Sequence, residues 1–269
     1  SKEYWGYALR IGIPIVPHYL SGIILNQGDR IMIDKMVGKT EVALYGLAYS
    51  IGMLVQLFIS GMNSALTPWM YSKIKKGDIR SMRKVLQLLS IVVVGIAVAL
   101  MLISPELVLI FGSPKYREAV YVIPPVAASV FFIFIYNILS MPQFYYEKTQ
   151  FLMAASMAAA GANVVLNFIF IRLFGYIAAG YTTLACYMLY SVGHYIVSKQ
   201  ILVNEGIQEN LMNPGFLLAC SVFLIGASII CNLIFPYRIL RYAILLASAG
   251  LVFWKKELLL KTMADIRKK

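Results

Sequence analysis

Charged residues are scarce in this sequence. Asp, Glu, Lys and Arg make up 13% of its 269 residues, about half of the ~25% found in an average soluble domain. Hydrophobic residues make up 60%, and runs such as residues 85–103 and 216–235 are long enough to cross a bilayer, which takes about 20 residues. The scarcity of charge excludes an ordinary soluble domain, and the sequence predicts an all-α polytopic membrane protein.

Catalytic and metal-binding signatures are also lacking. The sequence has no H-E-x-x-H, no G-x-S-x-G and no Walker-type phosphate loop, and the connections between its apolar runs are too short to hold a separate catalytic domain. Its three cysteines, Cys186, Cys220 and Cys231, lie inside apolar runs without the close spacing of a metal site. We therefore expect neither an enzyme nor a protein that binds a metal or another cofactor.

Eight membrane spans are predicted, at residues 8–36, 42–71, 82–103, 118–146, 149–172, 178–200, 213–235 and 238–254. An even number of spans places both termini on one side of the membrane. About two thirds of the 24 Lys and Arg residues fall at the span ends on that side, so the positive-inside rule puts both termini in the cytoplasm. Because the basic residues sit in these short connections, the net charge of +12 indicates membrane topology and no nucleic-acid partner.

Ionisable residues in the first predicted span mark it as the place to look for a transport pathway. Asp29 and Arg30 are adjacent, and His18 and Asn26 precede them at a spacing that keeps these side chains near one face of a helix. Such residues at membrane depth face a bundle interior or a wet cavity. The alternative is a helix end in the headgroup zone, where Asp29 and Arg30 would be ordinary.

Prolines inside two predicted spans are candidate hinges. Pro14 and Pro17 lie in the span at 8–36, and Pro124 and Pro125 lie in the span at 118–146. Proline removes a backbone donor and crowds the preceding turn, so each pair is expected to kink its helix. A kink of this kind would allow bending between inward-facing and outward-facing states.

A longer polar stripe follows in the span at 42–71. Its members recur every three or four residues, which keeps them on one side of a helix: Tyr45, Tyr49, Gly52, Gln56, Ser60, Asn63 and Thr67. Either this stripe packs against neighbouring helices, or the amides of Gln56 and Asn63, with that of Asn137 in the fourth span, line a cavity for a polar substrate. Asn163 and Asn167, one turn apart in the fifth span, either line the same cavity or hold helices together.

An ordered series of residues carries a family resemblance. The series is Pro14, Pro17, Ser21, Asn26, Asp29, Arg30 and Ile33, then Gly38, Val42, Tyr45, Ala48 and Tyr49, and later Phe111, Gly112, Tyr116, Arg117, Glu118 and Ala119. From about residue 7 to residue 255 the chain resembles the C-terminal lobe of Wzx-type polysaccharide flippases. These proteins belong to the multidrug/oligosaccharidyl-lipid/polysaccharide exporter superfamily.

The resemblance implies a division of the chain and a function. Residues 1–203 would form the C-terminal six-helix transporter lobe, and residues 204–269 would form two additional transmembrane helices and a basic cytoplasmic tail. Such proteins flip undecaprenyl-diphosphate-linked oligosaccharide across the bacterial inner membrane by alternating access, with a cation gradient as the suspected drive. The chain starts at Ser1 without a methionine or a signal-peptide pattern, so we expect a longer protein whose N-terminal lobe completes the cavity.

The implied substrate suggests roles and partners. Arg30 is expected to attract the diphosphate, with Asp29 or Asp34 holding Arg30 in position or pairing with it, and the lipid tail is expected to lie against the last two spans. The expected partners are the lipid-linked oligosaccharide, membrane lipid, the N-terminal lobe and polysaccharide assembly proteins. Two other functions stay open: an ion-coupled multidrug exporter, and a membrane glycan polymerase or ligase, which would need a longer outer loop.

Overall fold

The structure is a computed structural model that describes residues 2–254, apart from the side chains of residues 2, 3, 7, 8, 10, 11, 14, 249 and 251–254. Within this range the chain forms helices and no strand. They are α1 (Lys2–Met36), α2 (Lys39–Gly52), α3 (Leu54–Lys75), α4 (Ile79–Phe111), the 3₁₀ helix η1 (Pro114–Val122), α5 (Ile123–Tyr145), α6 (Thr149–Phe174), α7 (Ala178–Asn204), α8 (Pro214–Ile234) and α9 (Arg238–Trp254). The all-α prediction is confirmed, and the basic tail lies outside the described residues.

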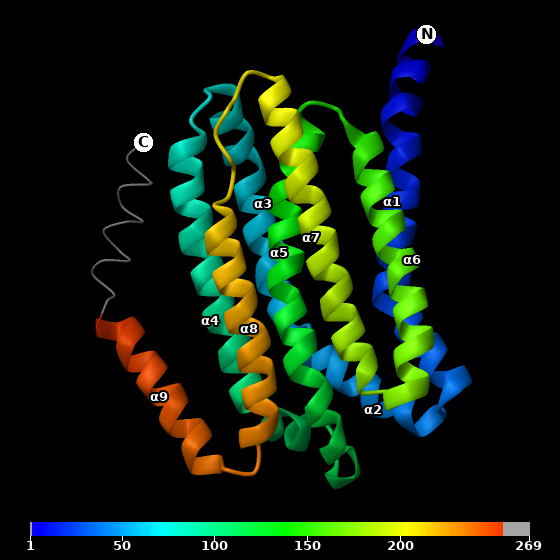
Figure 1. Cartoon of the computed structure of the whole chain (residues 1–269), viewed down its shortest axis with the longest axis vertical. Helices are drawn as coiled ribbons and strands as arrows, with labels where there is room; N and C mark the ends of the chain where they lie inside the picture. Colours follow the sequence, from blue (N-terminus) through cyan, green and yellow to red (C-terminus); the bar gives the residue numbers. More distant parts are fainter. Residues whose placement is uncertain (1, 255–269) are drawn as a thin grey trace.

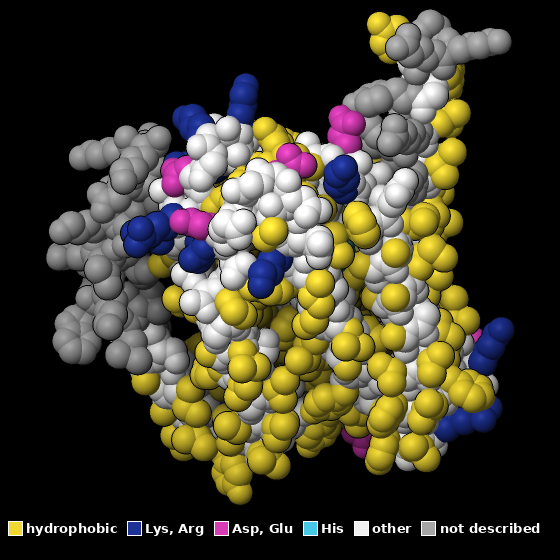
Figure 2. Space-filling view, turned by 45° about the horizontal axis from the view of Figure 1, so that its top comes forward, with side chains coloured by type: hydrophobic (Ala, Val, Ile, Leu, Met, Phe, Trp, Pro, Cys, Tyr) yellow, Lys and Arg dark blue, Asp and Glu magenta, His cyan; other side chains and the backbone are white. Residues whose placement is uncertain are grey.

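Five helical stretches of the described chain are long and apolar enough to cross a membrane. They are Lys39–Lys75, Ile79–Phe111, Pro114–Tyr145, Thr149–Phe174 and Pro214–Ile234. The other three predicted spans correspond to α1 and α7, which carry more polar residues, and to α9, which has 17 residues. Figure 2 shows helical walls covered by hydrophobic side chains, with most of the visible Lys, Arg, Asp and Glu side chains gathered toward the upper end and a smaller group at the lower right. The chain is therefore a polytopic membrane protein.

The two ends of the bundle differ in their connections (Figure 1). One end, here called the η1 end, carries α2, η1 and the turns that join α6 to α7 and α8 to α9. The opposite end carries the turns from α3 to α4, from α5 to α6 and from α7 to α8, and there the N-terminal part of α1 projects beyond the other helices. With 35 residues at ~1.5 Å each, α1 is about 52 Å long, well over the ~30 Å hydrocarbon core. Which end faces the cytoplasm stays a prediction.

Helix α5 forms the centre of the bundle. It packs against α7, α3, α4 and α8, and 89% of its apolar segment is buried, against 17% for that of α8. A helix that is apolar all round is stable only when it is buried all round or faces lipid. Helices α1 and α6 pair at one side of α7, whereas α9 lies at the opposite edge of the molecule (Figure 1).

The second predicted span is not one helix, and this corrects the sequence analysis. Helix α2 ends at Gly52 and α3 begins at Leu54, with Met53 between them. A side chain at Gly52 would place its Cβ 2.7 Å from the Val126 side chain, so α2 approaches the start of α5 as closely as only glycine permits. Figure 1 shows α2 inclined across the η1 end and α3 upright beside α5. The predicted polar stripe is therefore divided between two helices of different direction.

Two further expectations about local structure change. The connection between the spans predicted at 82–103 and 118–146 is in large part helical, because α4 continues to Phe111 and the nine-residue helix η1 begins at Pro114. Pro124 and Pro125 lie in the first turn of α5, where a missing backbone donor costs nothing, so they begin a helix instead of kinking one. Helix α1 is continuous through Pro14 and Pro17, and the Pro14 side chain is outside the described part. The role of Pro14 and Pro17 as a hinge stays a prediction.

Candidate functional site

A carboxylate with no exposed surface lies where four helices meet. Asp29 of α1 is 0% exposed, and side chains from three other helices donate hydrogen bonds to it. Tyr45 of α2 and Thr183 of α7 donate to Oδ2, the latter over 2.6 Å, and Asn167 of α6 donates to Oδ1 over 2.5 Å. This group, here called the Asp29 cluster, ties α1, α2, α6 and α7 together in the half of the bundle nearer the η1 end.

The two asparagines of α6 extend the Asp29 cluster. Asn167 accepts a hydrogen bond from Thr182 and donates to Asn163 Oδ1 over 3.1 Å, and both asparagines are 0% exposed. Their spacing of four residues puts them on one face of α6, and this face contacts α1 and the N-terminal part of α7. Of the two roles left open for this pair, the structure shows them joining helices, and neither lines the polar cavity described below.

No cation contacts the Asp29 carboxylate among the described residues. Arg30 points elsewhere: its Nη1 donates to Gln27 Oε1 over 2.5 Å, and its Cζ lies 5.0 Å from the centroid of the Tyr49 ring. The expected pairing of Arg30 with Asp29 or Asp34 is not present in this structure. Adjacent residues project about 100° apart around a helix, so Asp29 faces the interior while Arg30 lies over α2.

The Asp29 cluster has the chemistry of a site for a proton or a small cation. A buried ionised carboxylate is costly unless it is paired, and neutral donors compensate only part of its charge. The cluster supplies oxygen atoms from a carboxylate, amides and hydroxyls, the ligands that hard cations prefer. It does not suit a transition metal, since the described residues hold no group of three or more His, Cys, Asp or Glu side chains.

A polar cavity of about 450 Å³ opens between α1, α5 and α7. Its polar lining is His18, Asn26, Gln27, Tyr136, Asn137, Ser140, Tyr187 and Tyr190. The Tyr49 hydroxyl donates to Asn26 Oδ1 over 2.8 Å, and the Tyr190 hydroxyl lies 3.0 Å from His18 Nδ1. The structure thus brings three predicted residues, His18, Asn26 and Asn137, to one cavity, and Asn26 lies about one turn of α1 from Asp29.

Tyrosine rings form one wall of this cavity. Tyr136 of α5 stacks on Tyr187 of α7 with centroids 6.2 Å apart and planes 6° from parallel, and it lies 4.6 Å from Tyr190. Rings packed in this way hold one another in position and present flat apolar faces next to hydroxyl groups. The wall therefore offers both stacking and hydrogen bonding to a molecule in the cavity.

Two predicted residues do not join this site. Gln56 and Asn63 belong to α3, beyond the break at Met53, and neither lines the cavity between α1, α5 and α7. The break explains this result, because residues after Met53 follow the direction of α3. Gln56 and Asn63 therefore do not share this cavity with Asn137, and their role in lining a cavity for sugars stays a prediction.

Other buried polar residues were not named as site residues by the sequence analysis. Thr183 holds Asp29 directly, and Gln143 of α5 lies with its Nε2 2.7 Å from Nδ1 of the buried His194 of α7. Oxygen or nitrogen atoms of Gln143, His194 and Ser198 are buried without a partner. A polar side chain in an apolar run is the available signal for such residues, but it does not tell which of many such side chains meet.

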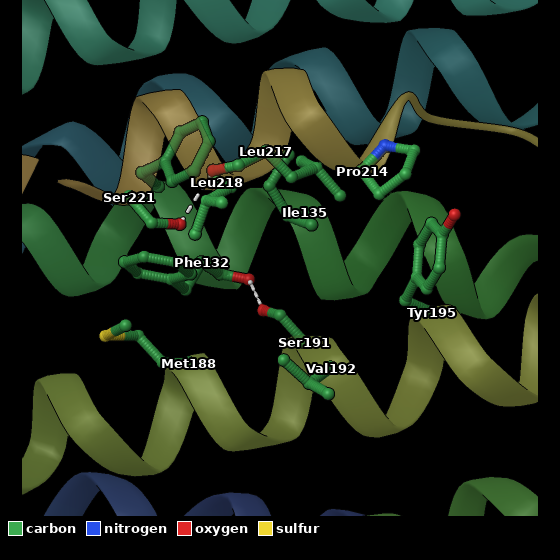
Figure 3. A pocket seen from close by; sticks show the side chains of 11 residues that line it. Phe132, Ile135, Met188, Ser191, Val192, Tyr195, Pro214, Leu217, Leu218 and Ser221 are labelled. Atoms are coloured by element: carbon green, nitrogen blue, oxygen red, sulfur yellow. Dashed lines mark hydrogen bonds between the residues drawn. The ribbon is translucent and has the colours of Figure 1, made fainter. Parts of the chain in front are cut away.

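A second, apolar groove of about 250 Å³ lies between α5, α7 and α8. Figure 3 shows Phe132 and Ile135 of α5, Met188 and Val192 of α7 and Leu217 and Leu218 of α8 around it. Its serines make hydrogen bonds to backbone carbonyls, as in the 2.9 Å bond from Ser191 to Phe132, so they offer little to a polar ligand. Neighbouring residues of α5, Ile135 and Tyr136, face the groove and the polar cavity respectively.

Comparison with known proteins gives a family match over the part of the chain that contains most of this site. Residues 14–169 match the MatE family. The chain is 29% identical over 159 residues to the "Lsg locus putative protein 1" of Haemophilus influenzae, covering 56% of this chain and 38% of that protein. It is 30% identical over 157 residues to an "Uncharacterized membrane protein" of the same organism, covering 55% and 37%. The matches thus span less than half the length of either relative, and no solved structure matches.

Proposed function

The chain belongs to the MatE family of membrane transporters, and from this premise we propose that it forms one lobe of a flippase for lipid-linked oligosaccharides. In this proposal residues 1–203 are the C-terminal lobe and an N-terminal lobe completes the transport cavity. The substrate is an oligosaccharide joined through a diphosphate to a polyisoprenoid lipid. It moves from the cytoplasmic to the outer leaflet of the bacterial inner membrane. Membership of a transporter family also agrees with the expectation that the chain is not an enzyme.

The observation that carries the proposal is a polar, aromatic cavity inside an otherwise apolar bundle. Amide, hydroxyl and imidazole groups of Asn26, Asn137, Ser140 and His18 face this cavity, and sugars need hydrogen-bonding partners of this kind. Helices α5 and α7 separate it from the apolar groove on their other side. This separation suits a substrate whose sugars enter the lobe while its lipid tail stays against the apolar outer surface.

Arg30 is proposed to attract the diphosphate. It lies at the rim of the cavity, because its hydrogen-bond partner Gln27 lines that cavity, and guanidinium groups bind phosphates through paired, charge-assisted hydrogen bonds. Its partners are the neutral Gln27 amide and the Tyr49 ring, so no ion pair among the described residues competes with a phosphate for its charge.

The test replaces Arg30 with alanine in the full-length protein. We expect Arg30→Ala to abolish surface polysaccharide while the amount of protein in the membrane stays normal. Arg172→Ala is the matched control, because Arg172 also rests on an aromatic ring, that of Phe168 at 4.0 Å, but lies in the last turn of α6. Normal polysaccharide in the Arg30→Ala strain would remove Arg30 from the proposal.

The Asp29 cluster is proposed as the coupling centre. Four helices contact it through hydrogen bonds, so uptake or release of a proton or a small cation changes the bonds that set their relative positions. Asn26 of the cavity lies one turn along α1 from Asp29, which gives the cavity and the cluster a shared rigid element. A cation gradient then drives the change of access.

The tyrosine wall favours one other candidate, an ion-coupled multidrug exporter. Rings such as Tyr136, Tyr187 and Tyr190 attract organic cations through their faces. The two candidates differ in what they move. An exporter lowers the toxicity of cationic dyes to cells and leaves surface polysaccharide unchanged when it is deleted, whereas a flippase gives the reverse pair of results.

A further inference from the structure

The 3₁₀ helix η1 frames a cavity that the proposed transport path does not use. This cavity of about 700 Å³ lies at the η1 end, between the last turns of α4, η1 and the turn from α8 to α9. Leu109 of α4 and Phe235 and Pro236 of the turn provide apolar walls, and Lys115, Arg117 and Glu118 of η1 provide the charged part of the lining. The site thus combines a charged rim with an apolar interior.

The sequence of η1 explains the shape of its side of the cavity. Runs of 3₁₀ helix longer than three or four residues are uncommon, and residues three apart lie directly above one another in them. The nine residues of η1 therefore align Lys115 with Glu118, and Pro114 with Arg117. Gly112 permits the turn into η1, since a Cβ there would lie 2.8 Å from the Leu47 side chain.

The opposite wall is held by contacts at the end of α8 and the start of α9. The ring of Phe235 lies 5.8 Å from that of Tyr121 in η1. Arg241 of α9 makes two hydrogen bonds of 2.8 Å with Glu106 of α4, next to Pro105, which also lines the cavity. These contacts hold the α8–α9 turn against α4 and η1, where it forms one wall of the cavity.

The charge of the lining is positive. Lys115 and Arg117 are exposed, and none of the ion pairs among the described residues includes them. The charge of Glu118 also acts on Tyr176 of the α6–α7 turn. The pKa of Tyr176 there is raised to about 12, first by burial and then by the negative charges of Glu118 and Glu41. Two unpaired cations beside apolar walls at a helix-bundle end suit an anionic lipid headgroup.

We propose that this cavity binds the phosphate of an anionic lipid, with Lys115 and Arg117 as its ligands and Leu109 and Phe235 against the start of its chain. Two lipids carry this chemistry: an anionic phospholipid of the bilayer and a diphosphate-linked isoprenoid. The site shares no residue with the cavity between α1, α5 and α7, so lipid binding here can be tested separately from the transport proposal.

The test measures lipid binding to the full-length protein in detergent by native mass spectrometry. Phosphatidylglycerol, phosphatidylcholine with the same acyl chains, farnesyl diphosphate and inorganic phosphate are compared. We expect phosphatidylglycerol or farnesyl diphosphate, or both, to bind more tightly than phosphatidylcholine, and whichever binds identifies the source. Each of Lys115→Gln and Arg117→Gln should weaken that binding about fivefold, and the double variant about 25-fold, on the scale of one cation at a membrane surface.

Two controls make the outcome decisive. Glu118→Gln removes the negative group of the lining and should tighten binding, an effect that misfolding would not produce. Lys39→Gln removes an exposed cation at the same end of the bundle, outside the cavity, and should leave binding unchanged. The proposal is overturned if phosphatidylcholine or inorganic phosphate binds as well as the anionic lipids, or if Lys39→Gln weakens binding as much as Arg117→Gln.

Discussion

Asp29 and Arg241 carry charges of opposite sign into the buried part of the bundle, and their surroundings differ in kind. Arg241 is 3% exposed and forms a two-pronged pair with Glu106, reinforced by a 2.6 Å hydrogen bond to the Leu102 carbonyl. Asp29 is 0% exposed and receives hydrogen bonds only from neutral groups. The Arg241 charge is paired within the protein, whereas no charged side chain of the described residues pairs with Asp29.

The difference separates a structural role from a functional one. Arg241 fastens the peripheral helix α9 to α4 through bonds to Glu106 and the Leu102 carbonyl. Asp29 joins four helices through bonds whose strength depends on whether its charge is neutralised, which is the property that a switch needs. The lesson is that the partner of a buried charge, more than its depth, indicates what the charge does.

The largest effect is expected from neutralising Asp29. Asp29→Asn keeps the size of the side chain and removes its charge, so transport of the lipid-linked substrate into vesicles should fall below detection. The thermal stability of the full-length protein should change little, because removing an uncompensated buried charge offsets the loss of one of the two acceptor oxygens. Asp34→Asn is the control, since Asp34 is exposed on the same helix. Full transport by Asp29→Asn would contradict the proposed coupling role.

Removing Arg241 from its pair with Glu106 should instead lower the stability of the protein. Arg241→Met leaves Glu106 without its partner, and loss of one member of a buried ion pair costs about 3–5 kcal/mol; because the Glu106 side chain is 25% exposed, we expect the lower end of that range. Equilibrium unfolding of the full-length protein measures this loss. The double variant Arg241→Met, Glu106→Gln should recover most of the stability, and failure to recover would show that Arg241 acts through packing.

The smallest effect is expected at the ion pair of Lys73 and Asp78, near the bundle surface. Asp78 accepts a 2.7 Å hydrogen bond from Lys73, and this bond and its cap of the Ser81 amide lower the pKa of Asp78 to about 2. A lowered folded-state pKa stabilises the fold above the ordinary pKa near 4, and that stability is lost as the pH falls from about 4 to 2. Because the Asp78 side chain is 36% exposed, we expect about 1 kcal/mol or less.

Asp78→Asn isolates this contribution. The variant keeps a capping side chain and removes the charge, so its stability relative to the unchanged protein should differ at pH 6 and converge toward pH 2. Unfolding measured at both values tests the expectation. A difference that is the same at pH 2 and pH 6 would show that the Lys73–Asp78 pair contributes nothing.

Much of the fold was predictable because it depends on local and additive properties. Long apolar runs separated by short charged connections predict membrane helices wherever they occur, and the ends of most helices fall within a few residues of the predicted ones. The break at Met53, which the pattern did not predict, shows the limit of such reasoning. Periodicity continues across residues 42–71, but the close approach of α2 to Val126 of α5 turns the chain there.

The candidate site was predictable in part. Ionisable and amide residues of the first span were identified from their cost in hydrocarbon, and His18, Asn26 and Asn137 do line one cavity. The roles of Asp29 and Arg30 were not separable by sequence, since adjacent residues on a helix point in different directions that depend on how the whole helix is rotated in the bundle. That rotation follows from contacts with α6 and α2.

Composition and hydrophobic pattern by themselves determined that this chain is a helical membrane protein with polar residues concentrated in its early helices. Those properties belong to single residues and short windows. Asp29 contacts Tyr45, Asn167 and Thr183, which are 16, 138 and 154 residues away from it in the sequence. The sequence pattern does not distinguish these residues from the other polar side chains of the same helices. Only the packing of α1, α2, α6 and α7 selects among them, because a buried donor is satisfied by whichever acceptor the neighbouring helix brings within reach.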